Sequence, residues 1–265
     1  MPAATEFEFR HRFWLIGAIF ALAFACYAFD HVNSAAGLAS LLVNPMATGD
    51  AVRIILAVAC IMVAAGVGMR LWGSAYLQGE VVHSVRLHSE ALVTDGPYRH
   101  VRNPLYLGTT LLTFGFGFLA SRVGWFVLVL GLLLFHYRLI RREEAELIRA
   151  QGDRYRAYCA RVPRLWPALR PRISAGNMRP WWRQAFLSET FMLSFLAAMI
   201  AYALTLRMNV FVGLVGCGVG IYLMQNLILK GRRGRASSAC DQYASLLLKE
   251  MRPEGRRYRR MPKLA

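Results

Sequence analysis

Six almost entirely apolar stretches constrain the fold of this chain more than any other feature. They cover residues 13–29, 51–71, 104–120, 123–140, 186–206 and 208–229. Each approaches or falls within the ~17–25 residues that an α-helix needs to cross the hydrocarbon core of a bilayer. With 56% hydrophobic residues and a mean hydropathy of +0.36, the chain is too apolar for a soluble protein. The sequence therefore predicts an all-α, polytopic membrane bundle of about six transmembrane helices.

The distribution of basic residues predicts which loops face the cytoplasm. The chain has a formal net charge of +17, and lysine and arginine collect on the cytoplasmic side of membrane proteins. If the N-terminus is cytoplasmic, six spans leave only Arg53, Arg122 and Arg207 of the 32 lysine and arginine residues on the far side. We therefore expect an integral protein of a bacterial inner membrane, with both termini and the active site facing the cytoplasm.

The loops between the apolar stretches predict three regions. Residues 1–180 form a membrane core with a cytoplasmic cofactor site, residues 181–230 add a transmembrane hairpin, and residues 231–265 form a basic cytoplasmic tail. Residues 72–94 are amphipathic, and we expect them to lie along the membrane interface. The tail contains a short amphipathic piece, 237–251, but no recognisable nucleic-acid module, so anionic lipid is its expected partner. The five cysteines are scattered, which predicts neither disulfides nor a metal site.

Two polar segments flank the hairpin predicted for residues 104–140. The first, residues 96–108, reads G-P-Y-R-H-V-R-N-P-L-Y-L-G. The second, residues 141–147, reads R-R-E-E-A-E-L and is followed by Tyr155, Tyr158 and the V-P-R-L-W-P of residues 162–167. The two spans are separated only by Ser121 and Arg122, so they must form an antiparallel hairpin. Both polar segments then lie at one membrane face, and we expect them to share a single cavity.

Charged side chains in these segments are candidates for chemistry. Carboxylates are costly where a helix leaves the bilayer, so Glu143 and Glu144 are functional candidates. Neighbours on a helix point ~100° apart, so one could face a pocket while the other pairs with arginine or meets water. The alternative is the solvated end of a long helix, with Arg142 and Glu146 as an i,i+4 pair.

Other polar residues of the sequence have two possible roles each. Arg99 and Arg102 could clamp an anionic ligand or meet lipid head groups. His88 and His100 could move a proton or be ordinary surface residues. A further buried carboxylate, Glu189, is expected to be structural and to pair with the arginine-rich segment before it.

Taken together, these motifs resemble the isoprenylcysteine carboxyl methyltransferase and phospholipid methyltransferase superfamily of integral membrane enzymes. The pattern of that superfamily is similar to G-P-Y-x-x-V-R-H-P-x-Y-x-G, a membrane hairpin, E-E-x-x-L, a glycine, two tyrosines and V-P-R-x-x-P. This chain departs from it at Asn103, which replaces the family histidine and cannot titrate. The matching residues are Gly96, Pro97, Tyr98, Val101, Arg102, Pro104, Tyr106, Gly108, Glu143, Glu144, Leu147, Gly152, Tyr155, Tyr158, Val162, Pro163, Arg164 and Pro167.

The resemblance implies a methyltransferase that takes S-adenosylmethionine as methyl donor and a lipophilic acceptor from the bilayer. It implies three catalytic candidates, which are Arg102, Glu143 and Glu144. It implies nine donor-binding candidates, which are Tyr98, His100, Arg102, Asn103, Pro104, Tyr106, Gly108, Glu143 and Glu144. It also implies substrate-binding candidates at Tyr155, Tyr158 and Arg164, and no metal.

Two other functions are compatible with the sequence. Some membrane sterol reductases resemble the same helical core, and four arginines could bind the 2′-phosphate of NADPH, namely Arg161, Arg164, Arg170 and Arg172. Alternatively, the chain could be a non-catalytic membrane protein whose basic tail docks lipid. For a methyltransferase, the sequence leaves the acceptor open among a prenylated cysteine carboxylate, a phospholipid amine and a thiol.

Overall fold

The computed structural model describes residues 2–44, 47–77, 92–225 and 227. The chain divides into two compact units, Met1–Gly218 and Val219–Ala265. Within the described ranges every regular element is a helix, and one isolated bridge pairs Asn33 with Ser121. The predicted all-α class is therefore confirmed. His88, the predicted tail and its amphipathic piece at 237–251 lie outside the described residues.

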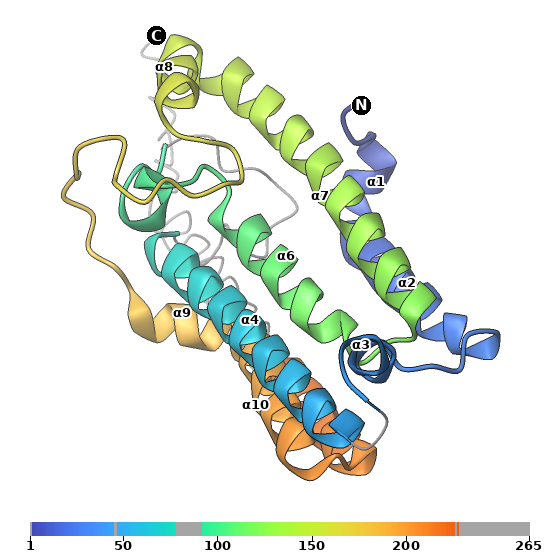
Figure 1. Ribbon diagram of the computed structural model, residues 1–265. Coiled ribbons are helices and arrows are strands. Elements are labelled where there is room, and N and C mark those ends of the chain that lie inside the picture. Colours follow the sequence, from blue (N-terminus) through green and yellow to red (C-terminus); the bar gives the residue numbers. More distant parts are fainter. Residues whose placement is uncertain (1, 45–46, 78–91, 226, 228–265) are drawn as a thin grey trace, which may run out of the picture. The chain divides into compact units, whose positions relative to one another are not determined.

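The first unit contains two long helices, several shorter ones and two 3-10 turns (Figure 1). They are α1 (Glu6–Arg10), α2 (Arg12–Ala25), η1 (Cys26–Ala28), α3 (Ser34–Leu42), α4 (Thr48–Tyr76), η3 (Gly96–Arg99), α6 (Pro104–Gly117), α7 (Arg122–Gln151), α8 (Asp153–Arg161), α9 (Trp182–Ser188) and α10 (Thr190–Thr205). A further helix covers Met208–Gln225.

Three of the described helices are long and apolar enough to cross a membrane: α4, α7 and Met208–Gln225. The pair α9 and α10 passes the same test together, but is bent by 67°. The polytopic membrane class is thus confirmed with three or four candidate spans. At 14 residues each, α2 and α6 rise only about 21 Å, which is less than the ~30 Å of a hydrocarbon core.

The second predicted span ends later than expected. The helix α4 continues through Trp72 to Tyr76, whereas the sequence predicted an interfacial segment from residue 72. The last turns of α4 pack against the start of α6, since a Cβ on Gly73 would lie 3.1 Å from Leu105 and 3.3 Å from Pro104. This packing keeps the chain helical beyond the apolar stretch. Residues 78–91 of the predicted segment lie outside the described residues.

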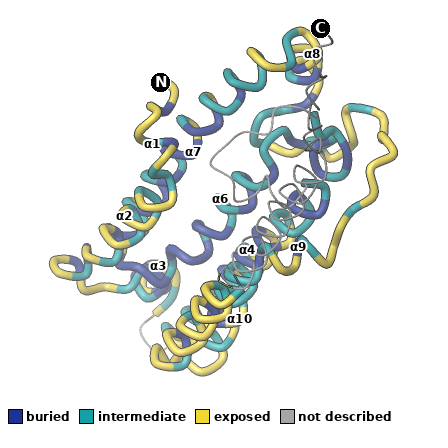
Figure 2. The backbone as a smooth tube through the Cα atoms, turned by 180° about the vertical axis from the view of Figure 1, so that it is seen from behind, coloured by how far each residue is buried: buried dark blue, intermediate teal, exposed yellow. Residues whose placement is uncertain are grey.

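The helices α6 and α7 form the predicted antiparallel hairpin. The turn ends at Ser121, whose side chain accepts a hydrogen bond from Gly124 N at 3.1 Å and caps α7. On its outer side α7 packs against α2, and α6 packs against α4, which also contacts α9 and α10. Figure 2 accordingly shows α6 as buried or intermediate along its whole length, whereas α10 is mostly intermediate.

The closest helix contact joins α4 and α6. A Cβ on Gly66 would lie 2.5 Å from Gly108 O and 2.7 Å from Leu112 N, and a Cβ on Gly108 would lie 2.6 Å from Gly66 O. Only glycine lets two backbones approach this closely. Gly66 and Gly108 therefore allow α4 and α6 to pack backbone against backbone.

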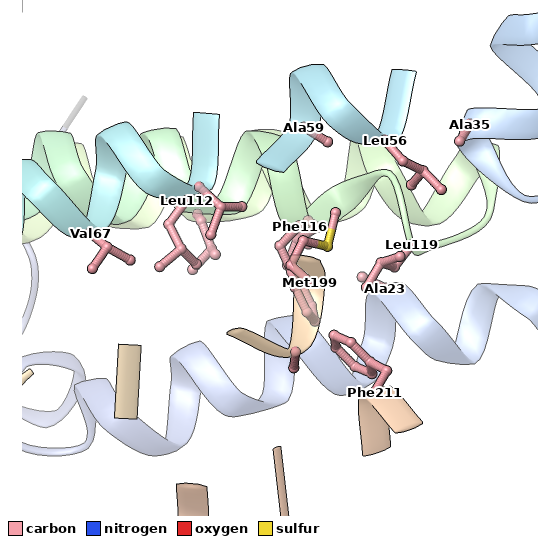
Figure 3. Close-up of a cluster of buried hydrophobic side chains, with 14 residues drawn as sticks. Ala23, Ala35, Leu56, Ala59, Val67, Leu112, Phe116, Leu119, Met199 and Phe211 are labelled. Atoms are coloured by element: carbon pink, nitrogen blue, oxygen red, sulfur yellow. The ribbon is translucent and has the colours of Figure 1, made fainter. Parts of the chain in front are cut away.

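Aliphatic side chains, together with the rings of Phe116 and Phe211, form a buried core between the helices (Figure 3). Phe116 of α6 lies at the centre, with its ring centroid 5.5 Å from that of Phe20 and 5.7 Å from that of Phe24. On the other side it lies 5.2 Å from Phe195 and 6.0 Å from Phe211. Residues from α2, α6, α10 and the last described helix therefore share one core.

A buried ion pair ties α4 to the bend between α9 and α10. Arg70 donates to both carboxylate oxygens of Glu189, at 2.7 and 2.9 Å, and Ser74 donates to the same carboxylate at 2.7 Å. Arg70 also donates to Thr109 of α6 at 2.7 Å. The sequence predicted that Glu189 pairs with the arginine-rich segment before it, and this prediction is wrong. The helix α4 packs against α9 and places Arg70 beside the carboxylate instead.

The N-terminal segment docks on α7. Glu8 accepts hydrogen bonds from Arg138 at 2.9 and 2.7 Å, and Ala4 N donates to Arg138 O at 3.0 Å. Phe9 is buried in an apolar cluster that Tyr106 also contacts. The N-terminal segment is thus part of the packed unit.

Replacing Glu189 with alanine is expected to destabilise the protein by about 3–5 kcal/mol, because Arg70 would stay buried without its counter-charge. Thermal unfolding in detergent measures this loss. Asp153→Ala is the control, since its pair with Arg156 is exposed, with side chains 95% and 66% accessible, and should contribute little. If the unfolding temperature fell equally in the two variants, the Arg70–Glu189 ion pair would not stabilise the contact between α4 and the α9–α10 bend.

Neutralising Glu8 is expected to release the N-terminal segment. Hydrogen bonds from the Thr5 backbone N–H and from Arg138 hold the pKa of the Glu8 carboxyl below its ordinary value. A carboxyl with a lowered pKa stabilises the folded state above its ordinary pKa, and this contribution is lost as the pH falls through the lowered value. Glu8→Gln mimics the protonated group at neutral pH, and should raise hydrogen exchange in residues 4–10. Exchange no faster than in the control Asp153→Asn would refute this.

Candidate functional site

The two predicted polar segments meet at the C-terminal end of α7. That helix continues well beyond its apolar part and ends at Gly152, whose φ of +56° favours glycine. The reversal at Gly152 starts α8 at Asp153. The loop that follows α8 then runs along the G-P-Y segment. This turn explains in physical terms why a glycine separates the two glutamates from the two tyrosines.

Glu144 is the buried anion of the site, with 5% of its surface exposed. Its Oε1 lies 3.1 Å from Arg102 Nε, and its Oε2 lies 2.8 Å from Arg164 Nη2. Asn103 Nδ2 lies 3.4 Å from Oε1 and donates to Arg164 O at 3.1 Å. The hydrogen bond to Glu144 raises the pKa of the Arg164 guanidinium. Two guanidinium groups around one carboxylate leave this part of the site with a net positive charge.

Glu143 points to a different partner, as expected for neighbours on a helix. Its Oε1 accepts a hydrogen bond from the Tyr106 hydroxyl at 2.8 Å. The Tyr106 ring packs edge-on against His136, with centroids 5.3 Å apart, and His136 Nδ1 lies 3.4 Å from Thr110 Oγ1. The sequence predicted one cavity shared by the G-P-Y segment and both glutamates, and within this region the structure places Tyr106 and Glu143 in direct contact. The expectation that they lie together at one end of the hairpin is confirmed.

Main-chain hydrogen bonds hold the loop after α8 against the G-P-Y segment. Ala168 N donates to His100 O at 2.9 Å, and His100 Nδ1 lies 2.8 Å from Ala168 O. Arg102 N donates to Pro163 O, and Arg172 N donates to Arg99 O, both at 2.9 Å. Arg99 Nε donates to Ile173 O. The sequence predicted both segments at this face, but not that their backbones pair.

The predicted tyrosines have structural contacts. Tyr98 is buried, and its carbonyl accepts a hydrogen bond from the Tyr158 hydroxyl at 2.7 Å. Tyr155 and Tyr158 pack with Val162 in a buried cluster. Burial raises the pKa of both hydroxyls, so they stay protonated at neutral pH. Substrate binding by Tyr155 and Tyr158 remains a prediction.

Two further donor-site candidates lie at the start of α6. Pro104 is its first residue, where a missing N–H has no cost. Gly108 faces α4 across the close contact with Gly66, so its side of the helix is turned away from Glu143. A direct contact of either residue with the donor remains a prediction.

Two local sequence patterns outside the family motifs also correspond to contacts near the site. The segment Thr5-x-x-Glu8 forms a capping box, which is a recognisable helix start and leads into the α1 segment beside Tyr106. The predicted alternative pair of Arg142 and Glu146 forms at 3.0 Å. This partly exposed pair forms together with the inward contacts of Glu143 and Glu144. The end of α7 is therefore both a solvated helix end and part of the candidate site.

Comparison with known proteins was consistent with the motifs. Residues 52–154 match the family model described as phospholipid methyltransferase. Protein-S-isoprenylcysteine O-methyltransferase of Schizosaccharomyces pombe (strain 972 / ATCC 24843) is 35% identical over 102 residues, which cover 36% of this chain and 43% of that protein. The chain therefore matches less than half the length of this curated relative. No solved structure matches the chain significantly.

The matched segment contains the G-P-Y motif, the hairpin and both glutamates, and it ends before Tyr155. The contacts of Arg102 and Tyr106 with the two glutamates therefore lie inside it. Over residues 52–154 this chain is similar to the isoprenylcysteine carboxyl methyltransferase and phospholipid methyltransferase superfamily, which confirms the resemblance seen in the motifs.

Proposed function

We propose that this integral membrane protein is a methyltransferase that uses S-adenosylmethionine and methylates a lipophilic acceptor. The observation that carries the proposal is the direct contact between the two motif segments, through Arg102 with Glu144 and Tyr106 with Glu143. Both contacts lie within the segment that matches the phospholipid methyltransferase family. The name of the S. pombe relative favours an oxygen acceptor of the isoprenylcysteine type, with a phospholipid amine or a thiol as alternatives.

The charged groups of the site fit the amino-acid end of S-adenosylmethionine. Oε2 of Glu143 accepts no hydrogen bond from a described residue, so it is available to an ammonium or a ribose hydroxyl. Arg102 Nε is buried, and no described acceptor is aligned with it, although it lies 3.1 Å from Glu144. A carboxylate of the donor would therefore have to compete with Glu144 for this N–H. The residues thus offer one anionic and one cationic group, as a zwitterionic ligand requires.

The protein mainly has to orient the reactants. When bound, S-adenosylmethionine supplies a methyl group that its sulfonium centre already activates. Glu143 and Arg102 would fix the position of the donor, and the packed loop after α8 would exclude water. Alignment of this kind can lower a barrier by ~7–11 kcal/mol.

The polar residues of the motif loop favour an acceptor that is already anionic. Asn103 cannot titrate, and it donates to Arg164 O. His100 Nδ1 lies 2.8 Å from the Ala168 carbonyl and donates to it, so Nε2 is the ring nitrogen left to accept a proton. A thiol or an ammonium group must first lose a proton to a base, whereas a carboxylate need not. We therefore propose a carboxylate acceptor on a prenylated cysteine or a similar amphiphile.

We further propose six spans with both termini and the site in the cytoplasm. The asymmetric distribution of lysine and arginine supports this arrangement. The two short helices are compatible with it, because α2 extends through η1 and packs on α7, and α6 is flanked by the longer α4 and α7. Protein contacts on both sides of α6 can satisfy its ends within the bilayer.

Radiolabelled methyl transfer tests the proposed function. The purified protein would be incubated with labelled S-adenosylmethionine and either a total lipid extract or a farnesylcysteine analogue. Label in the farnesylcysteine analogue supports the carboxylate acceptor, and label in the lipid extract supports a phospholipid. Binding of NADPH without binding of S-adenosylhomocysteine would instead support a reductase.

The two glutamates are expected to respond differently to neutralisation. Glu143→Gln should weaken binding of S-adenosylhomocysteine about 10–100-fold, as expected for loss of a charged hydrogen bond, with little change in stability. Glu144→Gln should weaken binding and also lower the unfolding temperature, because Arg102 and Arg164 lose their counter-charge. Isothermal titration and thermal unfolding measure both effects.

The matched control for Glu143 is Tyr106→Phe, which removes only the hydroxyl that donates to this carboxylate. It should keep most of the donor affinity. Unchanged affinity in both glutamine variants would refute the assigned roles of Glu143 and Glu144.

Substitutions at Asn103 test whether this position binds or titrates. Asn103→His should retain binding of S-adenosylhomocysteine, because an imidazole N–H can also donate to Glu144. Asn103→Asp should weaken binding and stability, because it places a second carboxylate about 3.4 Å from Glu144. The same titration measures the affinities. Retained affinity in Asn103→Asp would contradict a contact with the Glu144 carboxylate.

A further inference from the structure

The chain from residue 154 to residue 188 contains eight arginines and no acidic residue. Six of these arginines are exposed and form no ion pair with a described residue, and five of the six lie within residues 161–183. These five are Arg161, Arg170, Arg172, Arg179 and Arg183. A group of like charges without counter-ions is destabilising by itself, so this surface calls for an anionic partner.

Large apolar side chains are exposed among the same arginines. The exposed fraction is 84% for Trp166, 100% for Leu169 and 68% for Trp181. Tryptophan is enriched where a protein meets the membrane–water interface, because its ring is apolar and its N–H is polar. Leu169 gains only if it enters an apolar environment. The partner of this surface must therefore offer both negative charge and hydrocarbon.

Main-chain hydrogen bonds fix the loop that displays these side chains. In addition to the bonds to Arg99 and His100, Met178 N donates to Asp95 Oδ2 at 3.2 Å. Trp181 N donates to Ala75 O at 2.7 Å. Ala75 lies in the last turn of α4, which is a candidate membrane span. The end of the loop therefore lies where this span ends.

We propose that residues 161–183 form a docking surface for the head groups of anionic phospholipids. Arginine guanidinium groups bind phosphate, and each basic residue near an anionic leaflet strengthens the attraction about fivefold. Trp166 and Leu169 insert between the head groups, next to the bilayer that α4 spans. A nucleic acid would satisfy the arginines but would leave Leu169 without an apolar environment. This inference does not depend on the proposed methyl transfer.

The docked loop is continuous with the candidate site. It bonds to the backbone of the G-P-Y segment at Arg99, His100 and Arg102. An anionic leaflet would thus hold the loop that brings Arg164 to Glu144.

Tryptophan quenching tests the docking surface. The full-length protein would be placed in nanodiscs of phosphatidylcholine, or of phosphatidylcholine with phosphatidylglycerol, with bromine on the acyl chains as quencher. The difference between the wild type and Trp166→Phe gives the contribution of Trp166 alone. We expect this contribution to be quenched in the anionic discs, and much less in the zwitterionic discs. No quenching of Trp166 in either disc would overturn the proposal, because the surface would then face water or a protein.

Matched charge variants locate the effect. Arg170→Gln, Arg172→Gln and Arg179→Gln in one protein should abolish the additional quenching in anionic discs. Arg149→Gln, Arg154→Gln and Arg156→Gln remove the same charge from the exposed end of α7 and from α8, and should leave it unchanged. All six substitutions lie on exposed side chains, so both proteins should fold. If the two triple variants lost the additional quenching of Trp166 equally, the binding of anionic lipid could not be assigned to residues 161–183.

Discussion

Two glutamates buried among the described helices are each held by arginines from another segment. Glu144 is paired with Arg102 and Arg164, and Glu189 is paired with Arg70. Each pair joins segments that are distant in sequence, and leaving one partner unpaired would cost several kcal/mol. The pairs therefore restrict how the helices can be arranged. Apolar packing against lipid alone discriminates weakly between helix partners.

The same constraint links the fold to the site. Arg70 contacts both the α9–α10 bend and Thr109, one turn from Tyr106. The α1 segment contacts α7 through Arg138 and packs near Tyr106 from the other side. Tyr106 thus packs near the N-terminal segment, which lies outside the matched residues 52–154, and Arg70 ties the neighbouring Thr109 to Glu189, which also lies outside them. The parts of the chain that the family comparison does not cover support the part that it does.

Sequence patterns predicted the features that depend on local composition. The antiparallel hairpin followed from the short link at Ser121 and Arg122, and the divergent roles of Glu143 and Glu144 followed from helical spacing. The partner of Glu189 could not be predicted, because it depends on which helix packs beside it. The direct contact of Tyr106 with Glu143 was missed, since spacing brings two side chains to one face without giving their distance. The continuation of α4 to Tyr76 reflects packing against Pro104 and Leu105 rather than hydrophobicity.

The pairing of the loop after α8 with the G-P-Y segment has a consequence for sequence divergence. Bonds such as Ala168 N to His100 O and Arg172 N to Arg99 O use only backbone atoms. Most exchanges of side chain after Pro167 leave these bonds intact, so relatives could vary that part of the loop freely. A single inserted or deleted residue would instead move every later bond out of alignment. Constancy of length, rather than of residue type, is what this architecture demands between Val162 and Trp181.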